Sequence, residues 1–461
     1  MVTRHEPASR QPPAGLVGLT DLVRSAWRGR YVVLTESLGS AADSLVNEIA
    51  AAGGVVLGIL AANGGPRPAG TTPVHVLAEP GTRGLSRAGF AAQLRDLPRA
   101  ATDWLLAVDP DGEAQCIGTN FLEVTAVGGR TVVGGRRPRW AAYEDKTVTD
   151  DVFRRIGIPV PPSTVLASDD PRIAATVRGL SSAHGALVAL DSSSDYRGDA
   201  EGLRWIRRGD SVPDAVLAWA ATHARRIRVS AFYEGTPCSV LGIVTAGGIG
   251  VCDPMEIVTL RVAGSGRLVF AGSSNRWRPA PGAAAEIRRA ARLLGEELRS
   301  AADYRGFFSL DGILGDEGFR ATEVNPRLAS GLGLRAAVPG FPIYLFSRSL
   351  QLAGDPLAGL DAKSLTREIR ELVAARPSHS LRLPAELDGW PTPLAGLCGA
   401  TPAGTCRRTS AGVRYQIFPD GVTVASSLPA GPDGAVGAGV ADLGRELGWS
   451  LFARADQDAL T

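Results

Sequence analysis

Lysine and cysteine are scarce in this chain. Lysine occurs only at Lys146 and Lys363, so 47 of the 49 basic residues are arginine. This bias is typical of a GC-rich genome, and each remaining lysine becomes a candidate for a chemical role. The five cysteines are scattered, odd in number and without a CxxC pair. They exclude a disulfide framework and a zinc cluster, and they predict reduced thiols in a cytoplasmic protein.

Long apolar segments and excess charge are also missing. The first fifteen residues carry three charged side chains and three prolines, which is unlike a signal peptide. The longest uncharged run, Gly235–Cys252, is broken by glycine, proline and threonine and reads as buried strands. A net charge of +2 implies no large basic surface. We therefore expect a soluble protein that binds neither membranes nor nucleic acids.

Several common catalytic and nucleotide-binding motifs do not occur. There is no Walker A loop, no GxSxG and no Ser-x-x-Lys, and the five histidines show no ligand spacing. Residues 331–336 match GxGxxA formally, but no βαβ unit or later acidic residue accompanies them. The sequence thus excludes the P-loop route to ATP and disfavours both acyl-enzyme chemistry and dinucleotide binding.

A length of 461 residues predicts two to four domains. Residues 1–140 read as an α/β domain, because a strand (31–35), a helix (40–52) and a second strand (55–60) follow one another. A Gly-Gly-Arg-Arg-Pro break at 134–138 ends it. The fold class predicted for the whole chain is α/β and α+β multidomain. The further elements predicted are helices over 141–156, 282–302, 363–376 and 435–447, and strands over 186–190, 227–233, 239–245, 258–262, 414–418 and 422–426. Residues 355–461 form a small C-terminal α+β appendage of unknown role.

The most informative segment is FFSLDGILGDEGFRATEVNPR, from Phe307 to Arg327, which predicts a hairpin. Alternate residues of a strand share a face. A three-residue loop, 316–318, pairs Gly315 with Phe319 and sets Asp311 directly opposite Glu323. Asn325 and Arg327 then lie on the same face as Glu323.

Two opposed carboxylates repel each other unless a cation joins them. Oxygen ligands beside an amide and an arginine favour Mg²⁺ holding phosphate. The alternative is an acidic, solvated hairpin that needs no metal. Glu323, Asn325 and Arg327 are polar residues at alternate positions, between apolar ones, and therefore share one face of the strand. This arrangement favours the metal site.

The order of features resembles the ATP-grasp superfamily over about residues 135–345. A lysine at the head of a helix is followed by GIPVPPS, a strand-rich stretch, and then DGIL and EVNPR. The phrases GGRRPRWAAYEDK, SAFYEGTPCSV, DPMEIVTLR and ATEVNPR resemble a branch of carboxylate–amine ligases, the pheganomycin-type peptide ligases. The resemblance implies an N-terminal α/β domain followed by a two-subdomain ATP-grasp fold at 141–350, with a lid subdomain at 141–225 and a metal and phosphate subdomain at 226–350.

The resemblance also implies site residues. Asp311, Glu323 and Asn325 match the superfamily's Mg²⁺ ligands, and Arg327 matches an arginine that holds the γ-phosphate and then the acyl phosphate. Lys146 matches the first lysine, which neutralises α- and β-phosphate charge. The strand made of Arg228, Val229, Ser230, Ala231 and Phe232 matches one that offers backbone groups to adenine.

One position departs from the superfamily pattern. A second lysine is expected on a strand before a glycine-rich flap, and the matching position holds Ala189. The segment in the flap's place, Ser192–Asp199, contains a single glycine. Arg197 or a nearby arginine could compensate as a planar fork. The alternative is a nucleotide-binding protein that has lost activity.

The substrate side is less defined. Glu256 and Arg261 lie on opposite faces of a regular strand, so one of them could face the cleft, and Arg261 could bind a substrate carboxylate; a surface ion pair explains them equally well. Arg276 beside Trp277 could grip an anion, although Trp277 fits core packing better. Ser330 and Gly331 could line the acceptor side.

Together these features predict an ATP- and Mg²⁺-dependent ligase that joins a carboxylate to an amine through an acyl phosphate. The resemblance suggests an unusual amino acid as the acid and an amino acid or peptide as the amine, in natural-product biosynthesis. A homodimer is compatible with this prediction. The identity of the substrates, the general base for the amine and the role of the C-terminal region are not encoded in any motif.

Overall fold

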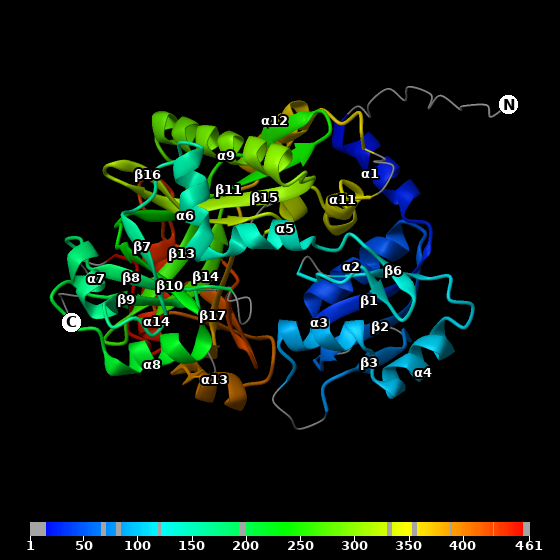
Figure 1. The fold of residues 1–461 in the computed structure, drawn as a ribbon, viewed down its shortest axis with the longest axis horizontal. Coiled ribbons are helices and arrows are strands. Elements are labelled where there is room, and N and C mark those ends of the chain that lie inside the picture. Colours follow the sequence, from blue (N-terminus) through cyan, green and yellow to red (C-terminus); the bar gives the residue numbers. More distant parts are fainter. Residues whose placement is uncertain are drawn as a thin grey trace.

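The computed structural model describes residues 15–65, 71–79, 84–118, 121–192, 200–329, 334–352, 357–387, 390–426 and 428–454. Within these ranges the chain builds an N-terminal sheet, a small sheet and a large central sheet, each packed against its own apolar cluster. Figure 1 shows the N-terminal sheet at one end of the molecule and the small sheet at the other, with the central sheet and its long helix between them.

The N-terminal sheet has the order β3-β2-β1-β4-β6-β5, and its strands are parallel except for β5. Strand β1 (Arg30–Ser37) is connected to β2 (Val55–Asn63) by helix α2 (Ser40–Ala51), which confirms the predicted βαβ start. Residues 31–35 of β1 are all buried, as expected for a parallel strand covered on both faces. The other elements here are α1 (Gly15–Ala26), β3 (Val74–Val76), α3 (Arg87–Arg95), α4 (Arg99–Val108), β4 (Gln115–Ile117), β5 (Ala126–Val127) and β6 (Arg130–Val133).

The single helix predicted over 141–156 is wrong, because the chain breaks at Asp145. Helix α5 (Pro138–Ala141) and the 3₁₀ turn η1 (Ala142–Glu144) precede α6 (Lys146–Arg155). Asp145 is extended (φ −72°, ψ 111°), and its carboxylate accepts a 2.8 Å hydrogen bond from the Thr147 backbone N–H. This is an N-cap, which satisfies an otherwise unpaired donor of the first turn. The cap makes Lys146 the first residue of α6.

The small sheet is antiparallel, in the order β7-β10-β8-β9. Its strands are β7 (Ser163–Ala167), β8 (Ala186–Leu190), β9 (Leu203–Ile206) and β10 (Arg226–Ala231). Helices α7 (Ile173–Leu180) and α8 (Asp214–His223) contribute to the apolar cluster behind it. The lid subdomain was predicted to end at residue 225, but β10 pairs with both β7 and β8 and so belongs to the small sheet. We therefore propose that the lid subdomain ends after residue 231.

The central sheet runs β16-β15-β11-β13-β14-β17-β22-β21-β20 and is antiparallel throughout. Helix α9 (Pro281–Ala301) covers one face and buries Ile287, Leu294 and Leu298 against it. The first strands are β11 (Thr236–Thr245), β12 (Gly248–Val251), β13 (Met255–Val262), β14 (Leu268–Ser274), β15 (Gly306–Gly315) and β16 (Gly318–Asn325). Helices α10 (Leu334–Ala337), α11 (Ile343–Ser349) and α12 (Ala362–Ala374) follow, and their apolar residues join those of α1 in one core.

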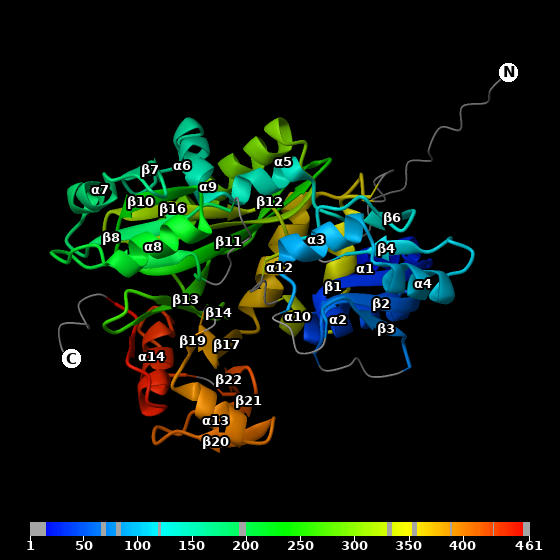
Figure 2. The same ribbon diagram turned by 60° about the horizontal axis from the view of Figure 1, so that its bottom comes forward.

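The C-terminal strands continue the central sheet, because β17 pairs with β14 and β23 pairs with β13. Figure 2 shows these elements below the central sheet. They are β17 (His379–Pro384), β18 (Glu386–Leu387), β19 (Trp390–Pro391), α13 (Leu394–Ala400), β20 (Thr405–Arg408), β21 (Arg414–Phe418), β22 (Gly421–Val424), α14 (Gly437–Glu446) and β23 (Leu451–Phe452). The predicted β21–β22 hairpin and final helix are confirmed. Among the described helices, none has the length and hydropathy of a membrane span.

Candidate functional site

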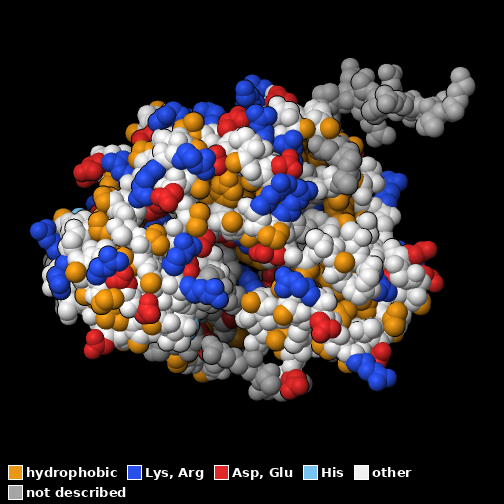
Figure 3. All heavy atoms as spheres, viewed as in Figure 1, with side chains coloured by type: hydrophobic (Ala, Val, Ile, Leu, Met, Phe, Trp, Pro, Cys, Tyr) orange, Lys and Arg blue, Asp and Glu red, His pale blue; other side chains and the backbone are white. Residues whose placement is uncertain are grey.

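A cavity of about 1000 Å³ lies between the three sheets. Residues from the carboxyl end of β1, from the small sheet and from the open face of the central sheet line it. Figure 3 shows this face of the molecule hollowed near its centre, with acidic and basic side chains around the hollow. The predicted metal ligands, Lys146 and Arg327 all contribute to its wall.

The hairpin forms as predicted, but its loop does not. Strands β15 and β16 meet at a two-residue turn, with Gly315 paired to Gly318, where three loop residues were expected. Gly318 has φ +97°, a conformation that favours glycine. A bulge after Asp311 adds one residue, Thr322, to β16, and this restores Asp311 to its position opposite Glu323. The turn and the bulge therefore compensate, and the predicted pairing of the two carboxylates is confirmed.

Asp311 is held by residues of the two strands that flank β15, namely β11 and β16. Ser239 of β11 donates a 2.6 Å hydrogen bond to its Oδ1, and Asn325 Nδ2 donates a 2.9 Å bond to its Oδ2. Burial, followed by the nearby charge of Glu323, raises the pKa of Asp311 to about 6. A carboxylate that is disfavoured in this way is stabilised by a cation.

Lys146 approaches the same carboxylates from α6. Its Nζ lies 2.8 Å from Glu323 Oε2, and both side chains border the cavity. The N-cap at Asp145 directs this lysine, so the break in the helix positions the cation. The ammonium group of Lys146 therefore pairs with Glu323 and not with Asp311.

Arg327 contacts two residues that the sequence prediction missed, Glu144 and Phe121. Its Nε donates a 3.1 Å hydrogen bond to Glu144 Oε1, and Arg136 Nη2 lies 3.2 Å from the same oxygen. Arg327 also donates from Nη2 to Asn325 Oδ1 at 2.7 Å. Its guanidinium stacks 4.6 Å from the ring centroid of Phe121. Glu144 stands two residues before Lys146. This proximity to a predicted site residue was the only local signal that could have identified Glu144.

The residues fit a magnesium ion held mainly by two carboxylates. Asp311 and Glu323 supply hard oxygen ligands, and Mg²⁺ commonly takes one or two carboxylates, with phosphate and water completing its shell. Asn325 contacts Asp311 and Arg327 in this structure, so its part in metal binding stays a prediction. No group of three His, Cys, Asp or Glu side chains suited to a metal occurs in the described residues.

The strand predicted to bind adenine is a central strand of the small sheet. Residues 227–230 of β10 are in register with both β7 and β8, so their backbone groups serve the sheet. Val229 is buried in the core behind the sheet, whereas Arg228, Ser230, Ala231 and Phe232 line the cavity. This strand therefore contributes side chains to the wall. The predicted backbone contacts from Arg228, Val229 and Ser230 are not available to a base.

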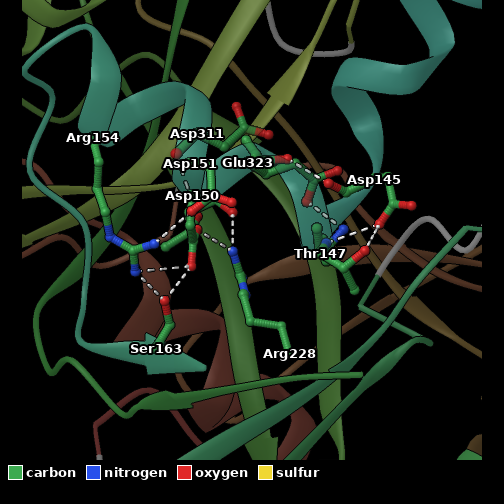
Figure 4. Close-up of polar contacts among 12 residues, drawn as sticks. Asp145, Thr147, Asp150, Asp151, Arg154, Ser163, Arg228, Asp311 and Glu323 are labelled. Carbon is green, nitrogen blue, oxygen red and sulfur yellow. Dashed lines mark hydrogen bonds and ion pairs between the residues drawn. The ribbon is translucent and has the colours of Figure 1, made fainter. Parts of the chain in front are cut away.

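Arg228 makes a buried ion pair that the sequence did not reveal. Its Nη1 donates to Asp150 Oδ1 at 2.7 Å and to the Thr322 carbonyl at 3.1 Å. Figure 4 shows Arg228 pointing from β10 toward Asp150, close to Asp311 and Glu323. Ser163 also donates to Asp150. The pair thus connects the small sheet, helix α6 and the β15–β16 hairpin.

The predicted substrate residues are mostly engaged in the protein. Arg261 lines the cavity but donates to both oxygens of Glu234, at 3.1 and 2.9 Å. Arg276 donates to the Leu428 carbonyl at 3.0 Å, and Trp277 is buried as expected. Ser330 and Gly331 lie outside the described residues. The same is true of Arg197 and of all but the first residue of the predicted flap, Ser192–Asp199.

Glu256 faces away from the cavity, which corrects the prediction that it contacts substrate. Its carboxylate accepts hydrogen bonds from the backbone N–H groups of Val436 (2.7 Å) and Gly437 (2.9 Å) at the start of α14. Burial raises its pKa, and these two bonds partly oppose that rise. Glu256 therefore attaches the C-terminal helix to the central sheet.

Replacing Glu256 with alanine is expected to lower the free energy of unfolding by about 2–4 kcal/mol, since two buried N–H groups lose their acceptor. Urea denaturation of the variant checks this value. Glu446→Ala is the matched control, because that carboxylate also accepts two hydrogen bonds from Ser410 but is exposed. We expect less than about 1 kcal/mol there. Equal losses in both variants would contradict the structural role.

Comparison with known proteins identifies the fold. No protein-family model and no curated protein matches the chain. An N5-carboxyaminoimidazole ribonucleotide synthetase in an ADP complex superposes with a TM-score of 0.52 at 12% identity, over 86% of this chain and 92% of that one. A pyruvate carboxylase from Rhizobium etli gives 0.51 at 14% identity, over 86% of this chain and 34% of that one. A carboxyaminoimidazole ribonucleotide synthase from Aspergillus clavatus, complexed with ATP, gives 0.50 at 16% identity, over 87% and 94%.

At these identities the similarity concerns the fold alone. It shows that the chain shares the multidomain fold of these enzymes, in agreement with the α/β and α+β fold class that the sequence predicted. The chemistry of this chain must be argued from its own cavity.

Proposed function

We propose that the chain is an ATP-dependent carboxylate–amine ligase that forms an amide bond through an acyl phosphate. The observation that carries the proposal is the pair Asp311 and Glu323, opposed across one hairpin and flanked by Lys146 and Arg327 in a single cavity. The ATP-grasp fold of the chain supports it. Two carboxylates can bind the metal of a metal–nucleotide complex, and two positively charged side chains can bind its phosphates.

In this proposal, Mg²⁺ bound to the carboxylates would neutralise phosphate charge. Lys146 and Arg327 would donate hydrogen bonds to phosphate oxygens, and Glu144 would keep Arg327 in place. The substrate carboxylate attacks the γ-phosphate and displaces ADP, and the amine then attacks the acyl phosphate and releases phosphate. The mixed anhydride must be shielded from water, and a cavity that lies between three sheets provides walls on several sides for that purpose.

The substrate classes are the finer part of the proposal. The phrases GGRRPRWAAYEDK and SAFYEGTPCSV resemble pheganomycin-type peptide ligases, which supports an unusual amino acid as the acid and an amino acid or peptide as the amine. The cavity is large enough for both beside a nucleotide. Cytoplasmic location is part of the same proposal, and the five free cysteines support it.

A binding protein without catalysis is the second candidate, because Ala189 stands where the superfamily has a lysine. Release of ADP distinguishes the two functions. We expect ADP release from ATP and Mg²⁺ to require an acid and an amine together, with an amide product identified by mass spectrometry. A panel of amino acids and dipeptides supplies the pairs. Nucleotide binding without ADP release from any pair would favour the binding protein.

A further inference from the structure

The alanine at position 189 has an arginine directly beside it. In the register of β8 with β10, Ala189 pairs with Arg228, and directly opposed residues of an antiparallel pair share a face. Their Cβ atoms are then about 5 Å apart. The neighbouring strand therefore presents a cation on the same face of the small sheet as position 189.

The Arg228 guanidinium retains unused hydrogen-bonding capacity. Its side chain is 5% exposed, and its hydrogen bonds to Asp150 and to the Thr322 carbonyl both come from Nη1. Nε is buried and has no hydrogen-bond partner among the described residues. An arginine carries five N–H donors in a fixed plane, so the Nε and Nη2 edge remains for a ligand. An unpaired buried donor is costly, and an anion in the cavity would satisfy it.

Asp150 orients the guanidinium of this arginine. An ion pair at 2.7 Å between two buried side chains, with Ser163 donating to the same carboxylate, fixes the guanidinium plane. Thr322, the second partner of Arg228, is the bulged residue next to Glu323. Lys146 contacts Glu323 from α6. The two cations therefore converge on the same part of the hairpin from different elements.

We propose that Arg228 binds the phosphate chain of the nucleotide and supplies from β10 the positive charge that Ala189 does not supply from β8. This assignment rests on the proposed function, since it requires a nucleotide in the cavity. Asp150 and Thr322 act as positioning groups that hold the arginine at the metal hairpin. Phosphate is the ligand whose oxygens match a planar, two-donor edge.

The test measures binding of Mg²⁺–AMP-PNP and of adenosine by calorimetry, in wild type and Arg228→Met. We expect the affinity for Mg²⁺–AMP-PNP to fall about 10- to 100-fold, as is usual for a lost charge-assisted hydrogen bond. Affinity for adenosine, which has no phosphate, is expected to stay within about twofold. Arg178→Met, an exposed arginine on α7, is the matched control and should change neither.

Two further variants protect the test from a folding defect. Asp150→Asn combined with Arg228→Met removes both buried charges and is expected to lose the same affinity as Arg228→Met. Adding Ala189→Lys to Arg228→Met is expected to restore part of it, since an amine then enters from the opposed position. If Arg228→Met keeps the wild-type affinity for Mg²⁺–AMP-PNP, or loses affinity for AMP-PNP and adenosine equally, the assignment of Arg228 to phosphate is overturned. The proposed function is not affected by either result. Failure of wild type to bind AMP-PNP would overturn the proposed function as well.

Discussion

Replacing Asp311 with alanine is expected to lower the rate of ADP release at least about 10³-fold, which corresponds to roughly 4 kcal/mol of lost transition-state stabilisation. Asp311 is one of the two opposed carboxylates and accepts hydrogen bonds from Ser239 and Asn325. Without it, Glu323 alone remains beside Lys146, and the cavity loses one of its two proposed metal ligands. Steady-state ADP release at saturating ATP and Mg²⁺, with the acid and amine that support wild-type turnover, measures the effect.

Asp316→Ala is the control for this substitution. Asp316 belongs to the same hairpin but lies exposed in its turn, away from the cavity. Its ADP release is expected to match wild type, with an unchanged melting temperature. Wild-type turnover in Asp311→Ala would remove the carboxylate pair from the mechanism.

Replacing Arg327 with methionine is expected to lower ADP release about 10²- to 10³-fold, the usual cost of removing one preorganised donor from a developing anion. The arginine is held by Glu144 and Asn325, so little reorganisation is required before it acts. Arg327→Lys is expected to retain part of the rate, because it keeps the charge but loses the planar fork.

The Arg327 prediction has its own control in Arg292→Met, an exposed arginine of α9 that should leave the rate unchanged. Because Arg327 also stacks on Phe121, melting curves must accompany the rates. A folded Arg327→Met variant with the wild-type rate would show that Arg327 serves only to join the hairpin to the N-terminal part of the chain.

The β15–β16 hairpin was largely predictable because strand alternation and one glycine turn are local properties. The opposition of Asp311 and Glu323 follows from the spacing, and it survives an error in the loop because the bulge at Thr322 offsets the shorter turn. The bulge itself could not be predicted, since it depends on β16 packing against its neighbours.

The supporting residues come from distant parts of the chain and therefore left no local signal. Ser239 reaches Asp311 only because β11 pairs with β15, and Asp150 reaches Arg228 only because α6 packs beside β10. Glu256 was misassigned because alternation gives the face of a strand but not what covers it. Helix α14 covers that face, and its first N–H groups use the carboxylate.

The interpretation of β10 changed for the same reason. Residues 228–232 were predicted to contribute backbone to a base, but residues 228–230 are paired on both sides and have little backbone to offer, whereas the contacts predicted for Ala231 and Phe232 stay a prediction. The side chain of Arg228 became the informative feature, and only the pairing register connects it to position 189. The sequence shows that Ala189 replaces the expected lysine, and the strand register shows that Arg228 lies opposite Ala189.

The most direct test of the nucleotide–metal site is thermal melting of wild type and Glu323→Ala with AMP-PNP and Mg²⁺, each alone and together. Binding to the folded state raises the melting temperature according to ligand concentration and affinity. The account predicts a joint shift of several degrees in wild type that is absent from Glu323→Ala. No joint shift in wild type, at millimolar AMP-PNP and Mg²⁺, would contradict it.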